Sequence, residues 1–204
     1  MQNTLEQLRL TADTLADEQQ QLRTDNYELR KQLEWNETEI DKLKQENLRK
    51  TFEISNVPET EGENLLDIAI QVCQEVGVVL ECKDVKEIFR APSYQSSKSQ
   101  FPPPIQVKLD SKAKRDEILA KKRAKKELTT TILNMTSNNS KVNIYLNEVL
   151  TKRNRYLYKI ARDLRRNNKI KFAWFKDGRL LIRQTERGKV REVTSINTLD
   201  EYRQ

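Results

Sequence analysis

The side chains whose types and spacing indicate a definite chemistry are lysines and arginines gathered in residues 111–128. That stretch, SKAKRDEILAKKRAKKEL, has eight basic and three acidic side chains and is typical of a helix. An exposed helix usually alternates the sign of its charges, so that acids stabilise bases four residues away. Here most of the repulsion is uncompensated, which favours binding of phosphate groups. A plain solvated helix face is the alternative.

A second basic stripe is predicted on a helix over residues 148–167. Apolar residues there recur at helical spacing and define the buried side. On the opposite side, cations recur at spacings of three and four residues. The apolar residues are Leu150, Leu157, Ile160, Ala161 and Leu164, and the cations are Lys152, Arg155, Lys159, Arg162 and Arg166.

The sequence IKFAWFKDGRLLIRQ, residues 170–184, predicts a β-hairpin, because Asp177-Gly178 suits a type I′ turn. Period-two alternation gives one face that mixes aromatic and basic side chains, namely Phe172, Trp174, Lys176, Arg179, Leu181 and Arg183. Such a face suits a nucleic-acid strand, because bases stack on aromatic rings while cations meet phosphates. The alternative is that Phe172 and Trp174 belong to the core.

These patterns define the candidate nucleic-acid contacts. Two of them, Arg90 and Lys108, lie on predicted strands. The candidates on the first basic helix are Lys114, Arg115, Lys121, Lys122, Arg123, Lys125 and Lys126. The second helix contributes its five cations, and the hairpin contributes Trp174, Arg179 and Arg183.

The net charge of +7 is distributed unevenly over the 204 residues. Residues 1–50 carry a net charge of −3, residues 51–107 carry −5, and residues 108–204 carry +15. A strongly basic half is the electrostatic signature of a polyanion-binding region. Nucleic acid is the first candidate ligand, and an anionic membrane surface is the second.

The composition argues against catalysis and metal binding. The chain has no histidine, which is the commonest general base and metal ligand, and no glycine-rich phosphate loop. We therefore expect no enzyme, no catalytic residue, no metal and no cofactor. The two cysteines are expected to be reduced and buried. No apolar run is long enough to span a membrane, so we expect no stable membrane insertion and a cytoplasmic protein, with the nucleus as the alternative.

The first fifty residues carry a heptad repeat. The d positions hold Leu8, Leu15, Leu22, Leu29 and Leu43, and the a positions include Leu33 and Ile40. This pattern predicts a coiled coil through which the chain self-associates. Asn26 at an a position favours a parallel dimer, while Leu at other a positions leaves a trimer open. The alternative is one amphipathic helix packed on its own domain.

The middle of the chain has a β-α-β-β-α-β order. Strands are predicted at 51–58, 84–92, 103–109 and 141–146, with helices at 63–78 and 111–128. The second helix is expected to pack through Ala113, Ala120, Ala124 and Leu128. This order is ferredoxin-like, the fold of RNA-recognition (RRM) domains.

The predicted fold is therefore α+β. It comprises a coiled coil over 1–50, an RRM-like domain over 51–147 and a helix-plus-hairpin domain over 148–204. An RRM stacks bases on aromatic residues of its first and third strands. Here Glu53 occupies that position on the first strand, and Gln106 and Lys108 face outward on the third. We therefore expect phosphate-led binding with little base readout.

Several motifs occur in order at the spacing of a known family: NVPETEGENLLDI, DVKEIFRAP, PPIQVKLDSKAKRDEILAKKRAKK, NIYLNEVLTKRNRYLYKIARDLRR and FAWFKDGRLLIR. Over roughly residues 50–195 the chain resembles the baculovirus few-polyhedra (FP) protein and its insect-genome relatives. It is also similar to the first-reading-frame protein of LINE-type retrotransposons. The resemblance implies a coiled coil, an RRM-like domain and a small C-terminal domain that assemble on single-stranded RNA.

The function expected from the sequence is that of an oligomer that coats single-stranded RNA, with DNA open as an alternative ligand. The two basic helices are expected to line one groove between their domains. A structural coiled-coil adaptor, or a virion assembly or occlusion factor without direct RNA binding, is the alternative. Viral and retroelement origins both remain open.

Overall fold

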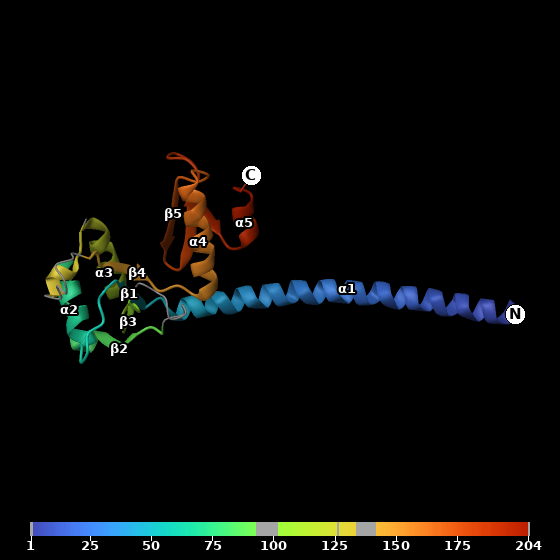
Figure 1. Cartoon of the computed structure of the whole chain (residues 1–204), viewed down its shortest axis with the longest axis horizontal. Helices are drawn as coiled ribbons and strands as arrows, with labels where there is room; N and C mark the ends of the chain where they lie inside the picture. The colour runs from blue at the N-terminus through green and yellow to red at the C-terminus, as the bar shows by residue number, and fades with distance from the viewer. Residues whose placement is uncertain (1, 93–101, 126, 134–141, 204) are drawn as a thin grey trace. The chain divides into compact units, whose positions relative to one another are not determined.

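The computed structural model describes residues 2–92, 102–125, 127–133 and 142–203 (Figure 1). The chain divides into two compact units, Met1–Leu43 and Lys44–Gln204. The observed architecture is α+β, as the sequence predicts: a long N-terminal helix, a four-stranded antiparallel sheet and a three-stranded sheet near the C-terminus. Within the described residues, no helix is both long and apolar enough to cross a membrane.

Helix α1, Gln2–Asn47, is continuous over 46 residues because no glycine or proline interrupts it. Its length is about 70 Å at 1.5 Å per residue. The predicted seam residues Leu8, Leu15, Leu22, Leu29, Leu33, Ile40 and Leu43 are between 50% and 66% exposed in the single chain. An exposed apolar row on a helix supports pairing with a second copy, and this pairing remains a prediction.

We expect removal of residues 1–36 to convert an oligomer into a monomer, because it removes most of the leucine seam. The truncation must stop there, because Gln45 at the end of α1 is buried and hydrogen-bonded within the second unit. Light scattering of both forms measures the change in mass. Leu22→Pro should act like the truncation, since proline within a helix costs about 3 kcal/mol or more. A monomeric full-length chain at micromolar concentration would contradict the coiled coil.

The second unit begins with a β-α-β-β-α-β domain. Its elements are β1 (Thr51–Ser55), α2 (Leu65–Glu75), β2 (Val85–Arg90), β3 (Ile105–Leu109), α3 (Lys112–Ala124) and β4 (Tyr145–Glu148). Two short 3-10 helices, η1 (Cys82–Asp84) and η2 (Thr130–Leu133), lie in its connections. The strand order β2-β3-β1-β4, with antiparallel neighbours, is the ferredoxin-like order that the sequence predicts.

The core of this domain lies between one face of the sheet and both helices. Phe52, Ile54 and Val107 point inward from the sheet and share one apolar cluster with residues of α2 and α3. The other face carries the alternate residues of each strand, which include Glu53. Of the two cysteines, Cys73 is buried in this core, and its burial raises the thiol pKa to about 12. Cys82 is exposed, contrary to expectation.

Helix α3 packs through a different side than the sequence predicts. Ala113, Ala120 and Ala124 are exposed, whereas Arg115, Ile118 and Leu119 are buried. The prediction failed because the larger Ile118 and Leu119 side chains remove more apolar surface from water than alanines do. The helix also ends at Ala124, so Leu128 is not part of it. Leu128 is nevertheless buried, and its backbone carbonyl accepts a hydrogen bond from the Ile144 N–H.

The C-terminal part combines one amphipathic helix with a small sheet. Its elements are α4 (Lys152–Arg166), β5 (Phe172–Lys176), β6 (Arg179–Arg183), β7 (Arg191–Val193) and α5 (Ile196–Asp200). Leu157, Ala161 and Leu164 of α4 pack against Ala173 and Ile182 of the sheet. Figure 1 shows α4 and α5 beside this sheet. The sequence predicted α4 and the hairpin, and it did not predict β7 or α5.

The hairpin has the predicted register and turn. Phe172 pairs with Arg183 and Lys176 with Arg179. Asp177 and Gly178 have φ values of 57° and 75°, as a type I′ turn requires. Ala173, Leu180 and Ile182 are buried on one face. Phe172 and Trp174 lie on the other face and are only partly buried, so they are not core residues packed under α4.

Candidate nucleic-acid interface

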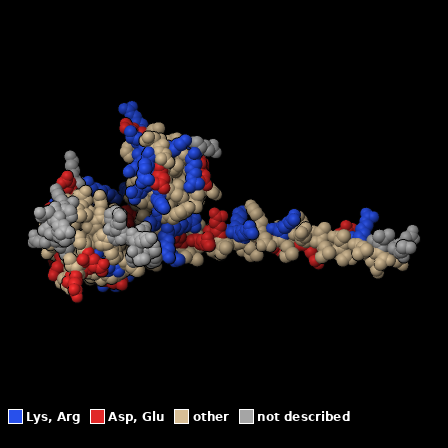
Figure 2. Space-filling view, in the orientation of Figure 1, with Lys and Arg blue, Asp and Glu red and all other residues tan. Residues whose placement is uncertain are grey.

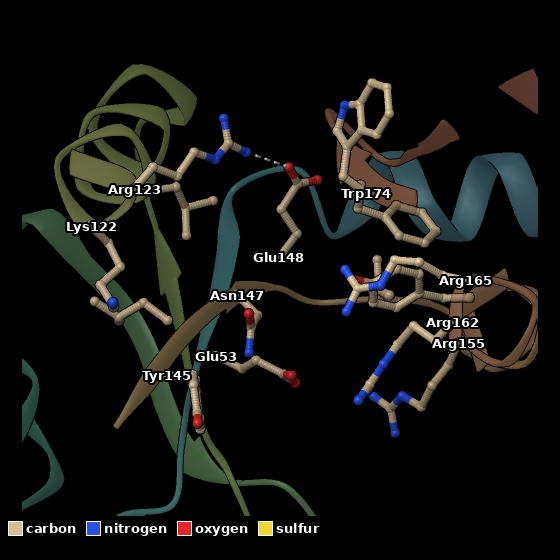
Figure 3. Close-up of a pocket in the computed structure, with 15 residues that line it drawn as sticks. Glu53, Lys122, Arg123, Tyr145, Asn147, Glu148, Arg155, Arg162, Arg165 and Trp174 are labelled. Atoms are coloured by element: carbon tan, nitrogen blue, oxygen red, sulfur yellow. Dashed lines mark ion pairs between the residues drawn. The ribbon is translucent and has the colours of Figure 1, made fainter. Parts of the chain in front are cut away.

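A cleft of about 740 Å³ opens between α3, the β1 and β4 strands and α4 within the second unit (Figure 3). Its lining includes five basic side chains. Lys122 and Arg123 come from α3, and Arg155, Arg162 and Arg165 come from α4. The two helices that the sequence singled out for their positive charge therefore contribute to one concave surface.

Periodicity explains which cations of α4 face the cleft. Arg155, Tyr158, Arg162 and Arg165 follow one another at spacings of three, four and three residues, which places them along one side of a helix. Lys159 and Arg166, which belong to the predicted stripe, lie further around the helix and do not line the cleft. Basic side chains are numerous on the face shown in Figure 2 over the part of the unit that carries α4 and the hairpin.

The floor of the cleft comes from the outer face of the four-stranded sheet. Glu53 on β1 lies directly opposite Asn147 on β4, and Tyr145 is two residues away on the same face. Burial raises the pKa of Glu53, and the nearby positive charge of Arg155 partly opposes that shift. Figure 3 shows Arg155 and Arg162 across the cleft from Glu53.

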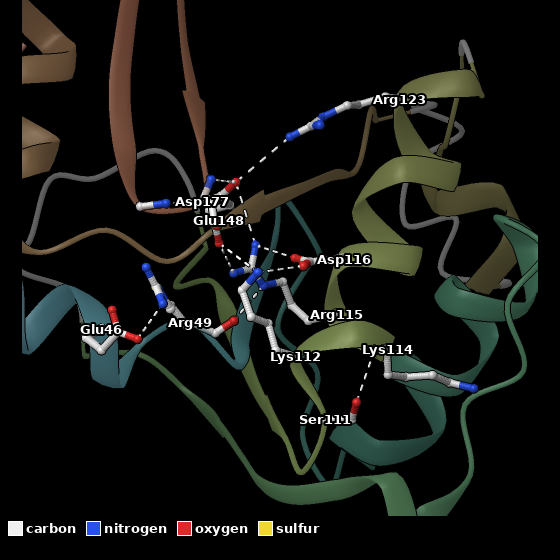
Figure 4. Close-up of polar contacts among 11 residues, drawn as sticks. Glu46, Arg49, Ser111, Lys112, Lys114, Arg115, Asp116, Arg123, Glu148 and Asp177 are labelled. Carbon is white, nitrogen blue, oxygen red and sulfur yellow. Dashed lines mark hydrogen bonds and ion pairs between the residues drawn. The ribbon is translucent and has the colours of Figure 1, made fainter. Parts of the chain in front are cut away.

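Glu148 joins the hairpin to the four-stranded sheet. Its two carboxylate oxygens accept hydrogen bonds from the backbone N–H groups of Asp177 and Gly178, at 3.1 and 2.9 Å. The same carboxylate pairs with Arg115 at 3.6 Å and Arg123 at 3.8 Å (Figure 4). This joint fixes the hairpin turn beside α3 and so sets the relation between the two walls of the cleft.

Lys112 and Asp177 strengthen the same joint. The Lys112 Nζ lies 2.9 Å from an oxygen of Asp177 and 2.9 Å from an oxygen of Asp116 (Figure 4). The hydrogen bond from Lys112 lowers the pKa of Asp177. The folded protein therefore keeps Asp177 ionised further into the acidic range than an exposed aspartate.

Gln45 forms a second joint, at the start of α4. Its side-chain amide donates to the carbonyl of Val149 at 2.8 Å and accepts from the Thr151 N–H and the Asn154 amide, both at 3.0 Å. Thr151 is the N-cap of α4, and its hydroxyl accepts from the Asn154 N–H. One buried glutamine thus positions the helix that supplies most of the cleft cations.

We expect Gly178→Ala to destabilise the protein by about 2–3 kcal/mol, which is more than Gly62→Ala. Both glycines have positive φ, so alanine is strained at either position, at a cost of about 1–2 kcal/mol. At Gly178 the added Cβ would also lie 2.9 Å from Gln45 Cγ, whereas at Gly62 no atom lies within 4 Å. Overpacking adds about 1 kcal/mol or more. Denaturant unfolding of both variants measures the difference, and equal losses would contradict the tight contact at Gln45.

The structure does not leave Arg115 available for a ligand. It is 2% exposed, and its Nε donates to the Arg49 carbonyl at 2.7 Å. Its guanidinium group also pairs with Asp116 and Glu148. Arg115 is therefore not available as a nucleic-acid contact, because a buried arginine that is held by acidic partners serves the fold.

Arg90 is likewise engaged within the protein. Its guanidinium group pairs with Glu63, and it donates to the backbone carbonyls of Val57, Pro58 and Pro103. The Arg90 and Glu63 side chains are 10% and 12% exposed. This arginine fixes the loops at one end of the sheet, so we also remove it from the predicted contacts.

Apart from Trp174, the other described contacts that the sequence predicts are spread over the surface and do not line the cleft. Lys108 pairs with Glu87, Lys114 with Asp84, Lys125 with Glu75, Arg166 with Asp163, and Arg179 with Glu192. Lys121, Lys152 and Lys159 are exposed on their helices. The Arg183 guanidinium group stacks over the Phe172 ring, 4.4 Å from its centroid. Lys126 lies outside the described residues. Trp174 does line the cleft.

The polar and aromatic lining residues that the sequence did not predict as contacts are Glu53, Tyr145, Asn147, Glu148, Tyr158, Arg165 and Phe175. Arg165 was detectable, because it lies three residues after Arg162 on the same helical face. Tyr145 and Asn147 were not predicted, because the stacking residues of an RRM lie on its first and third strands. They lie on β4, whose outer face meets the cleft.

The fold and the cleft define a ferredoxin-like domain joined to a small helix-and-sheet domain with a basic surface between them. Residues 151–203, which span α4 to α5, match the family described as baculovirus FP protein domain 2. The match supports the FP part of the predicted resemblance, for the segment that forms one wall of the cleft. Comparison of the chain with curated proteins gave no match.

Proposed function

We propose that the protein binds single-stranded RNA in the cleft between α3 and α4, mainly through phosphate contacts, and that it does so as an oligomer. The observation that carries this proposal is the meeting of five cations from two helices on one concave surface. Two acidic side chains, Glu53 and Glu148, share that surface. Because five cations outnumber these two acids, the net charge of the lining is positive.

A single strand suits this surface better than a duplex. The cleft places aromatic side chains, Tyr145, Tyr158 and Trp174, among its cations. Unpaired bases can stack on such rings while the backbone follows the positive charge. Stacked base pairs in a duplex expose only their edges, so they cannot use the ring faces.

Oligomerisation would multiply the effect of one weak site. If the exposed leucine row of α1 pairs two or three chains, the same number of clefts engages one strand of RNA. The second contact is then intramolecular, and the avidity can exceed the affinity of one cleft by about 10² to 10⁴. This arrangement favours coating of long RNA over recognition of a short site.

The similarity of residues 151–203 to baculovirus FP protein domain 2 supports a viral protein of FP type as the biological setting. The alternative setting is a retroelement-type ribonucleoprotein, which rests on the resemblance of the sequence motifs. The genes beside the coding sequence distinguish them. Viral late genes would favour the first setting, and a reverse transcriptase frame would favour the second.

A second candidate function is that of a structural adaptor in virion assembly, without direct RNA binding. The exposed leucine row on α1 favours it, because a coiled coil can join protein partners as well as copies of this chain.

A direct comparison of ligands separates these functions. The full-length protein is mixed with labelled single-stranded RNA in a gel-shift assay and with anionic vesicles in a co-sedimentation assay. The proposal expects a shift of the RNA at micromolar protein or below, and weaker retention by the vesicles. Binding to vesicles alone would indicate a membrane-surface protein, and binding to neither would favour the adaptor.

A further inference from the structure

The outer face of the four-stranded sheet carries an aromatic ring at the cleft. Tyr145 is 48% exposed and belongs to the cleft lining. It lies on β4, an edge strand of the sheet, and its neighbours Leu146 and Ile144 are buried in the core. A ring fixed on a strand and exposed to a basic cleft can stack a base at little cost in conformational entropy.

Two polar side chains lie next to this ring, and neither has a hydrogen-bond partner among the described residues. Glu53 and Asn147 face each other across β1 and β4 and line the cleft. Within residues 2–92, 102–125, 127–133 and 142–203, neither side chain makes a hydrogen bond to another described residue. A hydrogen bond from or to a ligand stabilises polar groups that are partly removed from water.

The charge of Glu53 decides what kind of partner it can have. A carboxylate repels phosphate, so Glu53 cannot serve the backbone contacts that the surrounding cations favour. It can accept hydrogen bonds from N–H groups, as ionised carboxylates do. Within a nucleic acid, such donors occur on the edges of the bases.

We propose that Tyr145, Glu53 and Asn147 form a nucleobase subsite that prefers guanine. This inference rests on the proposed function and adds a base contact to it. The ring of Tyr145 stacks on the base, the Glu53 carboxylate accepts from two donors of the base edge, and the Asn147 amide donates to the neighbouring carbonyl.

Guanine matches this set because its Watson–Crick edge presents two adjacent donors, N1–H and the N2 amino group, beside the O6 acceptor. The two donors can meet the two oxygens of one carboxylate, and bidentate pairing of this kind is strong. Adenine, cytosine and uracil each present only one donor group on that edge, so they cannot make both bonds. A bidentate contact discriminates between bases by about 1–3 kcal/mol, or roughly 5- to 150-fold.

The test uses the full-length protein and three uridine-rich RNAs of equal length. The first carries spaced guanosines, the second carries inosines at the same positions, and the third has uridine only. Inosine lacks the N2 amino group and is otherwise identical to guanosine on this edge. We expect the guanosine RNA to bind about 5-fold or more tightly than the inosine RNA. Glu53→Gln should abolish this preference and leave the affinity for the uridine RNA equal or higher.

Two aromatic variants complete the test. Tyr145→Ala should weaken binding of all three RNAs by about 5-fold or more, since stacking on an aromatic ring contributes about 1–3 kcal/mol per base. Tyr145→Phe should bind like the parent. Phe89→Ala is the matched control, because Phe89 is 38% exposed on the outer face of the same sheet and does not line the cleft. Circular dichroism checks that each variant folds.

The outcomes separate the base subsite from RNA binding itself. If the parent binds no RNA, the proposed function fails. If the parent binds all three RNAs equally, or if Glu53→Gln retains the preference for guanosine, the subsite is wrong while phosphate-led binding survives. Equal effects of Phe89→Ala and Tyr145→Ala would also overturn the subsite.

Discussion

Replacing Lys122, Arg155 and Arg162 together by glutamate will lower the affinity for single-stranded RNA by about 100-fold at moderate salt. These side chains come from both walls of the cleft. Each exposed charge pair contributes up to about 1 kcal/mol, and 1.4 kcal/mol equals tenfold in affinity, so the loss of three pairs gives about two orders of magnitude. Fluorescence anisotropy with a labelled RNA measures the change, and circular dichroism confirms the fold.

The matched control reverses Lys121, Lys159 and Arg166, three cations that lie on the same two helices outside the cleft lining. Both triple variants change the net charge by the same amount, so a general electrostatic attraction would affect them equally. We expect the control to lose less than about 10-fold. Equal losses of affinity in the two variants would show that RNA binds to the whole basic surface and not to the cleft.

The second large effect is on stability. Arg90→Ala will lower the free energy of unfolding by about 3–5 kcal/mol, because it leaves the nearly buried Glu63 carboxylate without its partner. The variant also removes the donors to the carbonyls of Val57, Pro58 and Pro103. A domain of ordinary stability, with about 5–15 kcal/mol in total, would lose a large fraction of it. Denaturant unfolding measures the loss.

Lys108→Ala is the control for Arg90→Ala. Lys108 is a predicted contact on a neighbouring strand, and its exposed pair with Glu87 spans 3.6 Å. Such pairs contribute about 0–1 kcal/mol, so we expect little change.

The Arg90 contact also lowers the pKa of Glu63. A lowered carboxyl pKa stabilises the fold above the ordinary glutamate range, and this contribution is lost as the pH falls through the folded-state pKa. A parent-like Arg90→Ala variant would show that the contact is dispensable.

The elements with strong periodicity were predictable from the sequence. The heptads of α1, the alternation of β1 and β3, and the Asp177-Gly178 turn each follow from local spacing. Strand β7 was not predictable, because Arg191–Val193 is short and its position depends on pairing with β6. Helix α5 is only five residues long and depends on packing against α4 and β7.

The candidate site was predictable in its charge and less so in its members. Local spacing identifies which helices are basic, but tertiary contacts decide which cations are buried in ion pairs and so cannot bind a ligand. Arg115 and Arg123 lie eight residues apart on one helix, and both pair with Glu148. Of these two arginines, only Arg115 is buried. Similarly, the partner of Arg90 is Glu63, 27 residues away, and no local pattern indicates that pair.

If the cations of the cleft bind RNA phosphates, the affinity for RNA must fall as the salt concentration rises. For single strands, log K falls against log salt with a slope of about −0.7 per phosphate neutralised. If all five cations that line the cleft make contacts, the slope is about −3.5 per protomer, and a fourfold rise in salt weakens binding by about 100-fold. The cleft triple variant should have a slope shallower by about 2. A slope near zero for the parent protein, or the same slope for both proteins, would contradict the account.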